Sequence, residues 1–467
     1  MYRIESDLIG ELNIPVEAYY GIQTQRGINN FNISGVKLYN YPTIIKGLAY
    51  VKWAAVEANG EFGLIPKEVV TAVVEACKEV LTGTFDNQFP VDMIQGGAGT
   101  STNMNANEVI ANIALEKLGQ PKGAYQHCSP HDVLNCSQST NDAYPAAIVL
   151  AIYFSNQKLV EQLKSLSDSF RAKANTYRDI LKMGRTHLQD AVPMSFGQMF
   201  DAYADTLDIE IANLNAIATS CLEVSMGATA IGTGINAIPG YAELCTKKMA
   251  QITGLPIKQA KNFIESTPDT SGFVSYSSAV KRLATKLSRL MNDLRMLSSG
   301  PRCGLNEINL PGVQPGSSIM PGKVNPVMPE SVNQVCFKVI GNDLAVTLAS
   351  EAGQLQLNVM EPIILYSILE SVTILGNALD GLRIHCIDGI TVNEEHSKEL
   401  VLNSIGIVTA LNPYIGYENS TTIAKEALEK NRSVYDLILE RNILTKEQLD
   451  TILSPEHMIY PQKKENF

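Results

Sequence analysis

The chain has 467 residues, of which 45% are hydrophobic and 18% are charged, and its 37 basic and 48 acidic residues give a net charge of −11. This length can bury a stable core and corresponds to about three domains, while the composition excludes collagen-like, disordered and disulfide-scaffold proteins. The negative charge disfavours general nucleic-acid binding, because the surface would repel a phosphate backbone. A small anionic substrate would need its own local cluster of cations and hydrogen-bond donors.

Cysteine usage and hydropathy indicate the compartment. Several of the eight cysteines lie in apolar helical sequence, for example Cys77 and Cys336, which is typical of buried free thiols in a reducing environment. The N-terminal sequence lacks the basic-then-apolar pattern of a signal peptide. The most apolar uncharged run, residues 143–154, is too short to span a bilayer and contains a proline. We therefore expect a soluble, cytoplasmic protein.

Long amphipathic helices are predicted through the middle of the chain, at residues 148–170, 203–226, 280–297 and 332–348. In the third of these, the apolar positions are spaced by three and four residues in strict alternation: Val280, Leu283, Leu287, Leu290, Leu294 and Leu297. This spacing, close to 3.5 residues, is typical of helices that pack at a shallow angle in a bundle.

Three regions follow from this pattern. Residues 1–140 mix shorter helices with loops and form an N-terminal domain, residues 141–395 form a central bundle domain, and residues 396–467 form a small domain of short helices. The boundary segment is Asp388–Asn393, where the long helical pattern ends. We expect an all-α, three-domain subunit.

Helices of about 25–35 residues span roughly 40–50 Å, more than a small domain can cover, so we also expect a closed, symmetric oligomer.

Four polar segments interrupt the helical pattern, at residues 96–103, 138–142, 184–190 and 316–326, and each is predicted to precede a helix. Hydroxyls, amides and backbone N–H groups at helix N-termini bind anions. Helix capping explains any single segment better, for example Ser139 or Thr140. Four such segments, two of which add His187 and Lys323, favour an anion-binding site.

Other common functional motifs match the sequence poorly. The glycine-rich segments Gly96–Thr100 and Gly227–Gly234 are neither phosphate loops nor dinucleotide fingerprints, because no strand precedes them and no Gly-Lys-Ser/Thr follows. No Gly-x-Ser-x-Gly nucleophile elbow is present. A loose group of His and Cys residues lacks the paired spacing of a zinc site, so we predict no metal ligands; its members are His127, Cys128, His131 and Cys136.

The segment GSSIMPGKVNP at residues 316–326 resembles the signature of the fumarase/aspartase superfamily, and the other segments match that superfamily's blocks in order over nearly the whole chain. Several blocks resemble aspartases rather than class II fumarases, at residues 96–109, 138–145, 184–193, 300–311 and 351–362. Class II fumarases tend to read Ser-Ser-Asn-Asp at residues 139–142 and Phe-Glu-Leu-Asn-Val within residues 354–362. The Ser129–Asp132 loop departs from both branches, so the resemblance does not assign a secondary anion site to it.

The resemblance implies a reaction, the reversible elimination of ammonia from L-aspartate to give fumarate. Removing the Cβ proton places charge on the neighbouring carboxylate, as an aci-carboxylate, which preformed donors must stabilise. The resemblance assigns the base to Ser317, with backbone N–H groups near Ile319 and Met320 and the charge of Lys323 stabilising its alkoxide. A weaker match suggests that Glu330 orients His187. Ser317, His187 and Lys323 are thus the expected catalytic residues.

The same resemblance assigns the substrate-binding residues. Donors to the carboxylate that accepts the charge are Thr100, Ser139, Thr140 and Ser318. The other carboxylate is assigned to Lys323 and Asn325, and the amino group to Asn141, Thr186 and His187. The implied assembly is a homotetramer in which three subunits build each active site. No cofactor is required for this chemistry, and activation by Mg²⁺ is expected from the resemblance although no convincing ligand set is present.

Three alternatives compete with this interpretation. A class II fumarase would use the same fold with water in place of ammonia; argininosuccinate and adenylosuccinate lyases are more distant, because their substrates need larger pockets. A non-enzymatic bulk protein, like the crystallins of this superfamily, would be expected to have degraded site loops. All four loops here retain their hydroxyl, amide, histidine and lysine groups, which favours the enzyme.

Overall fold

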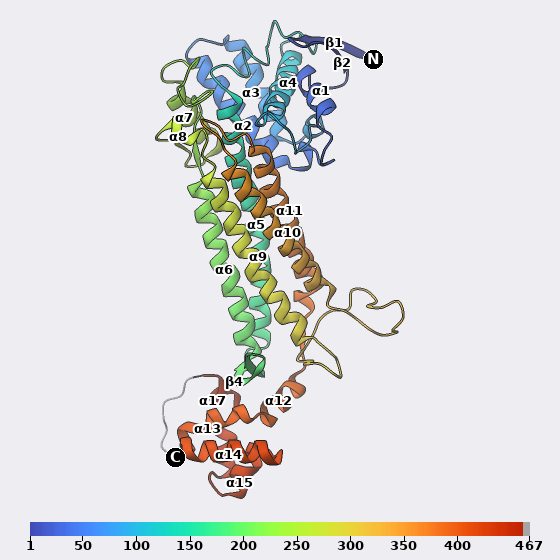
Figure 1. Ribbon diagram of the computed structural model, residues 1–467, viewed down its shortest axis with the longest axis vertical. Helices are drawn as coiled ribbons and strands as arrows, with labels where there is room; N and C mark the ends of the chain where they lie inside the picture. Colours follow the sequence, from blue (N-terminus) through green and yellow to red (C-terminus); the bar gives the residue numbers. More distant parts are fainter. Residues whose placement is uncertain (461–467) are drawn as a thin grey trace. The chain divides into compact units, whose positions relative to one another are not determined.

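The computed structural model describes residues 1–460 and divides the chain into two compact units. The first unit comprises Met1–Val160, Ala212–Ala284 and Phe337–Leu375, and the second comprises Glu161–Ile211, Thr285–Cys336 and the chain from Gly376 onward. Five long helices contribute residues to both units (Figure 1): α5 (Thr140–Thr176), α6 (Phe196–Ser220), α9 (Ser271–Leu297), α10 (Val327–Glu351) and α11 (Glu361–His385). Within residues 1–460 the strands form only two-stranded sheets. The predicted all-α fold is confirmed.

The long helices form the predicted bundle. All six residues of the 3-4 seam on α9 are buried. In the first unit, Asn156 of α5 is fully buried and joins two other helices, because it accepts from Tyr276 Oη of α9 at 3.1 Å and donates to Asn215 Oδ1 of α6 at 3.0 Å. In the second unit, Ser167 of α5 donates to Asp208 of α6 at 2.7 Å. Buried polar groups that are paired in this way help to define one register between helices.

The observed bounds of the four predicted helices differ from the predicted ranges, most clearly for α5 and α6. α5 begins at Thr140, earlier than expected, and includes Pro145 as an interior residue, which removes the helical hydrogen bond to the Asn141 carbonyl. α6 ends at Ser220 rather than near residue 226. The reason is that β5 (Glu223–Val224) pairs in parallel with β6 (Lys258–Gln259), and Gly227 then takes a φ of 91°, so the backbone leaves the helical conformation.

Shorter helices complete the first unit. They are α1 (Ile22–Asn30), η1 (Leu38–Asn40), α2 (Pro42–Glu61), α3 (Lys67–Leu81), η2 (Asp86–Gln88), α4 (Thr100–Lys117), α7 (Tyr241–Thr253) and α8 (Phe263–Ser266). α2 packs against α3, α4 and α7. The buried face of α2 is largely made of aliphatic residues and alanine, so its neighbours approach closely. The start of α4 is held in place because α4 packs against α2 and α3.

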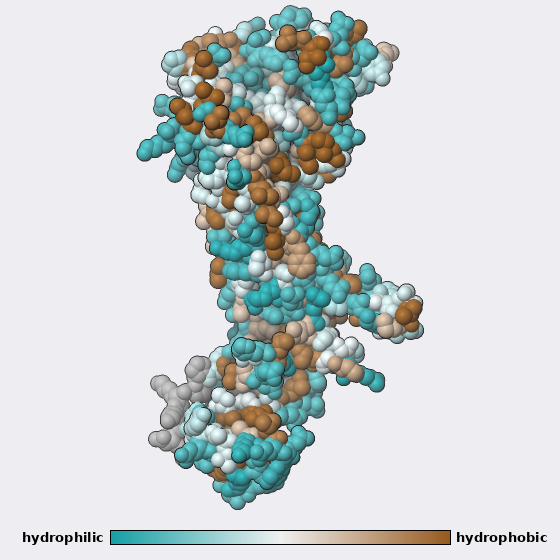
Figure 2. All heavy atoms as spheres, viewed as in Figure 1, coloured by the Kyte–Doolittle hydropathy of each residue, from teal (hydrophilic) through white to brown (hydrophobic). Residues whose placement is uncertain are grey.

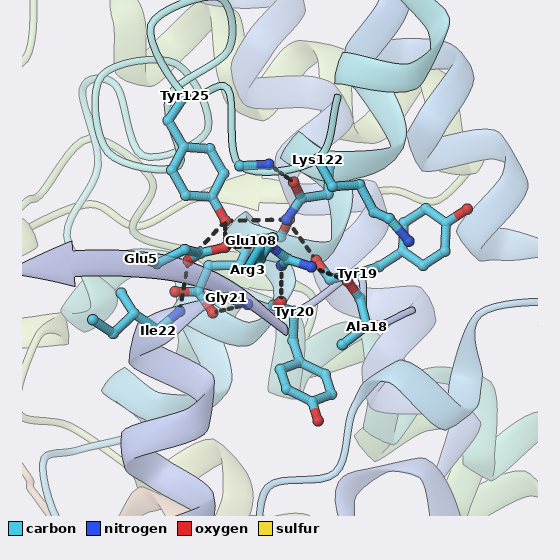
Figure 3. Close-up of polar contacts among 12 residues, drawn as sticks. Arg3, Glu5, Ala18, Tyr19, Tyr20, Gly21, Ile22, Glu108, Lys122 and Tyr125 are labelled. Carbon is cyan, nitrogen blue, oxygen red and sulfur yellow. Dashed lines mark hydrogen bonds and ion pairs between the residues drawn. The ribbon is translucent and has the colours of Figure 1, made fainter. Parts of the chain in front are cut away.

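A buried polar network fastens the N-terminal hairpin, β1 (Tyr2–Asp7) with β2 (Gly10–Pro15), to α4 (Figure 3). Glu5 accepts from Arg3 Nε at 2.8 Å and from Tyr125 Oη at 3.1 Å, and Glu108 of α4 accepts from the backbone N–H of Gly21 at 2.8 Å. Burial raises the pKa of Glu108 to about 7 although hydrogen bonds oppose this. A Cβ atom at Gly21 would lie 2.6 Å from both Glu5 Oε2 and Tyr125 Oη, so a larger residue there would displace the network.

The second unit combines short helices with a hairpin, β3 (Leu181–Thr186) and β4 (Gln189–Ser195). The helical elements are η3 (Ile387–Gly389), α12 (Glu394–Asn403), η4 (Ile405–Ile407), α13 (Val408–Ile415), α14 (Tyr417–Lys430), α15 (Val434–Glu440), α16 (Lys446–Ile452) and α17 (Pro455–Ile459). Leu181 and Met183 of β3 share a buried hydrophobic core with α12–α17. A short ribbon of β7 (Ile308–Asn309) and β8 (Thr391–Val392) completes the unit.

The boundary segment Asp388–Asn393 lies after the end of α11, as expected. The predicted domain ranges 1–140, 141–395 and 396–467 remain predictions, and the last seven residues of the third range lie outside the described residues. By length and composition alone, Glu361–Gly389 could cross a membrane, but 61% of its most apolar window is buried in the structure. A core helix of a helical bundle has these properties.

Candidate active site

Three predicted site residues lie together at the start of α5. Ser139 precedes this helix, and Thr140 and Asn141 are its first residues. Thr100 begins α4, and Asn103 of α4 donates from Nδ2 to Thr140 Oγ1 at 3.1 Å. The two helix N-termini are therefore directly connected within the first unit.

A glycine allows these helix N-termini to approach. Gly99, the residue before α4, has a φ of 87°, and a Cβ atom there would lie 2.3 Å from the Tyr144 ring of α5. Any other residue would push the ring away and separate Thr100 from the start of α5. The Gly-rich sequence before Thr100 is thus explained by close packing as well as by the open backbone of a loop.

Two of the hydroxyls in this group accept a hydrogen bond and keep their own proton. Ser139 Oγ accepts from the backbone N–H of Asn141 at 3.2 Å, and Thr140 Oγ1 accepts from Asn103. Because a hydroxyl has one proton to give, both residues retain a free donor for an anion. Thr100 differs, since its hydroxyl donates to the Gly97 carbonyl at 2.7 Å and would have to rotate before it could bind a substrate.

Two buried charged residues support this group, and the sequence analysis missed both. Asp142 accepts from the Ser139 N–H at 2.9 Å, and burial raises its pKa to about 7. Lys52 of α2 is 1% exposed, donates to Gln138 Oε1 at 2.9 Å, and has its pKa lowered to about 7 by burial. The only sequence signal was a lysine within an otherwise apolar helix face, which could not by itself reveal its partners.

Thr186 and His187 lie in the second unit, at the turn of the β3–β4 hairpin. This corrects the expectation that residues 184–190 directly precede a helix: β4 lies between them and α6. Thr186 pairs with Gln189, and the two turn residues, His187 and Leu188, have φ values of 56° and 62°. Positive φ at both central positions is the geometry of a tight hairpin turn. His187 is thus exposed on a turn with a strained backbone, a common property of functional residues.

A buried ion cluster holds this hairpin. Glu307 is completely buried, and its carboxylate lies 3.3 Å from Lys182 Nζ and 2.5 Å from Arg185 Nη1. Burial lowers the pKa of Lys182, while the charge of Glu307 opposes that shift. Arg185 immediately precedes Thr186, so the cluster fixes the strand from which Thr186 and His187 extend.

Replacing Glu307 with alanine is expected to destabilise the protein by about 3–5 kcal/mol, because two cations would remain buried without their carboxylate. The measurement is the urea midpoint at fixed protein concentration. Glu399→Ala, which changes an exposed carboxylate of α12, is the matched control. Equal midpoints for the two variants would show that the cluster does not support the fold.

The segment that contains Ser317 forms a loop closed at its base. The Gly316 N–H donates to the Lys323 carbonyl at 2.7 Å, and Asn325 Nδ2 donates to the Gly316 carbonyl at 2.8 Å. A Cβ atom at Gly316 would lie 2.7 Å from Lys323 O. The backbone of Lys323 is therefore fixed while its side chain stays exposed, and one N–H of Asn325 remains free for a ligand.

Within this loop, the Ser317 hydroxyl lies against two backbone donors. Ser317 Oγ accepts from the N–H of Ile319 at 3.2 Å and of Met320 at 3.0 Å. These are the two amides that the sequence suggested. Two N–H donors aimed at one oxygen favour its anionic form, which a serine needs if it is to act as a base.

The predicted site residues thus form three groups. The first unit holds Thr100 with Ser139, Thr140 and Asn141; in the second unit, Thr186 and His187 share the hairpin turn, and the rest share the loop of residues 316–325. Within residues 1–460, no hydrogen bond joins the hairpin turn to this loop. The suggested pairing of Glu330 with His187 remains a prediction. In the same part of the chain, no three His, Cys, Asp or Glu side chains gather as metal ligands would.

Comparisons with known proteins identify the family of the chain. The lyase family matches residues 10–341 and the fumarase C C-terminal family matches residues 407–460. The aspartate ammonia-lyase of Pseudomonas aeruginosa is 58% identical over 461 residues, 98% of this chain and 97% of the relative. The aspartate ammonia-lyase of Escherichia coli strain K12 is 54% identical over 463 residues, 99% of this chain and 97% of the relative.

Two crystal structures show the same fold. The fumarate lyase:delta crystallin of Brucella melitensis bound to cobalt has a TM-score of 0.95 and 49% identity, covering 99% of this chain and 100% of that one. The class II fumarase of Schistosoma mansoni has a TM-score of 0.91 and 34% identity, with the same coverage. The chain therefore belongs to the lyase family that includes the aspartate ammonia-lyases and the class II fumarases.

Proposed function

We propose that this protein is an aspartate ammonia-lyase, which interconverts L-aspartate with fumarate and ammonia. The observation that carries this proposal is the Ser317 hydroxyl held by two backbone amides, within a chain 54–58% identical to aspartate ammonia-lyases over nearly its whole length. The class II fumarase is less similar, at 34%. A bulk protein would have no need for such a hydroxyl.

The reaction begins at Ser317. As its alkoxide, Ser317 removes the Cβ proton of L-aspartate, and the amides of Ile319 and Met320 stabilise the base before it reacts. The electron pair of the broken C–H bond moves onto the neighbouring carboxylate, which becomes the aci-carboxylate. Ser139 and Thr140 each have a free hydroxyl proton to donate to this charge, and preformed donors of this kind supply much of the stabilisation in enolate-forming enzymes.

The carbon–nitrogen bond breaks in the second step. The aci-carboxylate returns its electron pair to form the double bond of fumarate, and the amino group leaves as ammonia. Lys323 and Asn325 bind the other carboxylate in this proposal, while Asn141, Thr186 and His187 bind the amino group. Lys323 also supplies a local positive charge on a protein whose net charge is −11.

The absorbance of fumarate in the ultraviolet tests the proposal. With purified protein, absorbance should rise on addition of L-aspartate and stay constant on addition of L-malate. A rise with malate alone would identify the protein as a fumarase, and no rise with either substrate would favour a non-enzymatic role.

The proposed assembly is a homotetramer. Four apolar residues share one face of α10 in the first unit and remain exposed: Phe337 (61%), Ile340 (38%), Leu344 (59%) and Leu348 (59%). Figure 2 also shows hydrophobic side chains at the surface over the long helices. A continuous apolar stripe of this kind on a soluble protein marks an interface, and a second copy of the same bundle matches it. Sedimentation equilibrium that finds an active monomer would contradict the proposal.

Active sites shared between subunits should be detectable by complementation. Ser317→Ala and His187→Ala proteins are each expected to be nearly inactive, but mixed tetramers formed by refolding them together should recover part of the activity. Recovery is expected because some sites would then combine an intact Ser317 loop with an intact hairpin from another subunit. Mixed tetramers that form without any recovery would contradict shared sites.

The proposed partners are small molecules only, without nucleic acid or membrane, and the proposed location is the cytoplasm. The chemistry requires no cofactor in this proposal, and Mg²⁺ acts as an activator. The proposed site residues do not fit a permanently bound metal ion, because they are mainly hydroxyls and amides with one histidine and one lysine. Dialysis against EDTA is therefore expected to leave substantial activity, which added Mg²⁺ raises; complete loss of activity would contradict this.

A further inference from the structure

The glycine-rich loop Gly227–Gly234 resembles a phosphate loop in composition but has another arrangement. The N–H groups of Gly232 and Gly234 both donate to the Ala228 carbonyl, each at 3.1 Å. The loop therefore closes on itself instead of offering these amides to a ligand. A Cβ atom at Gly232, where φ is 91°, would lie 2.4 Å from the Phe263 carbonyl oxygen, so the loop rests tightly against α8.

This loop is attached to the start of α5 at two points. Asp142 Oδ2 accepts from the N–H groups of Gly227 at 3.1 Å and Thr229 at 2.9 Å, while its other oxygen accepts from Ser139. The second attachment is a hydrogen bond of 2.8 Å from Asn141 Nδ2 to the Ala230 carbonyl. Asp142 is fully buried, so the first attachment is shielded from water and holds the loop in place for the second.

The second attachment determines which way the Asn141 amide faces. A backbone carbonyl only accepts hydrogen bonds, so the atom of Asn141 next to Ala230 must be the nitrogen. The Oδ1 atom is thereby the end of the amide left for a ligand. An ammonium group has donors and no acceptor, and it matches such an oxygen. A carboxylate, which only accepts, does not.

We propose that the Gly227–Gly234 loop is the element that selects the amino group of the substrate, by holding the Asn141 amide with its oxygen toward that group. Asp142 is the positioning residue that fixes the loop. This inference rests on the proposed function, because it deepens the assignment of Asn141. It predicts that loosening the loop weakens the binding of ammonium more than the binding of fumarate.

The experiment compares Gly232→Ala with Gly254→Ala in the amination direction. Both glycines have positive φ, but a Cβ atom at Gly254 would have nothing within 4 Å, so this variant controls for backbone strain alone. Gly232→Ala should raise KM for ammonium about tenfold or more, the size of one hydrogen bond to a charged group. KM for fumarate should change less than about twofold, and Gly254→Ala should leave both constants unchanged.

Gly227→Ala is the second variant, in case Gly232→Ala does not fold as judged by circular dichroism. A Cβ atom at Gly227 would lie 2.8 Å from Ala242 Cβ, so this substitution also loosens the loop, and KM for ammonium should again rise more than KM for fumarate. Equal rises in the two constants, or no change in either, would overturn the inference. A wild-type protein that does not aminate fumarate would instead overturn the proposed function, and this control is measured first.

Discussion

Replacing Ser317 with alanine is expected to lower kcat by about 10²–10⁴-fold, the usual cost of losing a catalytic base. The hydroxyl accepts two backbone N–H groups, and no other ionisable side chain shares this contact among the described residues. Because the loop is closed by Gly316, Lys323 and Asn325, alanine should leave its backbone in place. KM for aspartate should therefore change only modestly.

Steady-state kinetics with Ser331→Ala as the control would measure this effect. Ser331 is an exposed residue of α10 that donates to the Met328 carbonyl, so its loss removes a serine hydroxyl without touching the loop. The control should keep wild-type kcat. A Ser317→Ala protein that retains more than a small fraction of the wild-type rate would show that another group takes the proton.

The bundle could be predicted because its signal is repeated along the chain. Each of the six seam positions on α9 is separated from the next by three or four residues and all six are buried, so one helix contains enough of the pattern to identify its buried face. The hairpin of residues 181–195 lacked such a signal. Its turn residues are His187 and Leu188 rather than the Asn, Asp or Gly that usually mark a two-residue turn, and the strand β3 has only six residues.

The site loops could be predicted for a different reason. The four polar segments are rich in residues with hydroxyl or amide side chains and in glycine, and such segments interrupt the periodic spacing of apolar residues in the helices. The residues that hold these loops could not be found in this way. Glu307 contacts Lys182 and Arg185, and Lys52 contacts Gln138, across separations of more than 80 residues. No periodicity within one segment connects such pairs, so only the folded chain reveals them.

Asp142 was missed for the same reason: its contacts are with residues far away in the sequence. In the sequence it is one more polar residue at the start of a helix, where a carboxylate is common. In the structure its two oxygens join Ser139 to the Gly227–Gly234 loop. In the sequence, an aspartate that caps a helix looks the same as one that links the helix to a distant loop. The two differ only in the groups that the carboxylate contacts in the folded chain.

Replacing Lys323 with alanine is expected to raise KM for aspartate about 10- to 100-fold and to lower kcat as well. The ammonium makes no ion pair within residues 1–460, so its charge is available to a substrate carboxylate, and one charge-assisted hydrogen bond accounts for a change of this size. The backbone of Lys323 should stay in place, because its carbonyl accepts from Gly316 whatever the side chain. Turnover should fall together with affinity, because in the proposed mechanism the same charge also stabilises the Ser317 alkoxide. Initial rates would be compared with those of Lys398→Ala, which removes an exposed lysine of α12, and an unchanged KM would show that Lys323 does not bind the carboxylate.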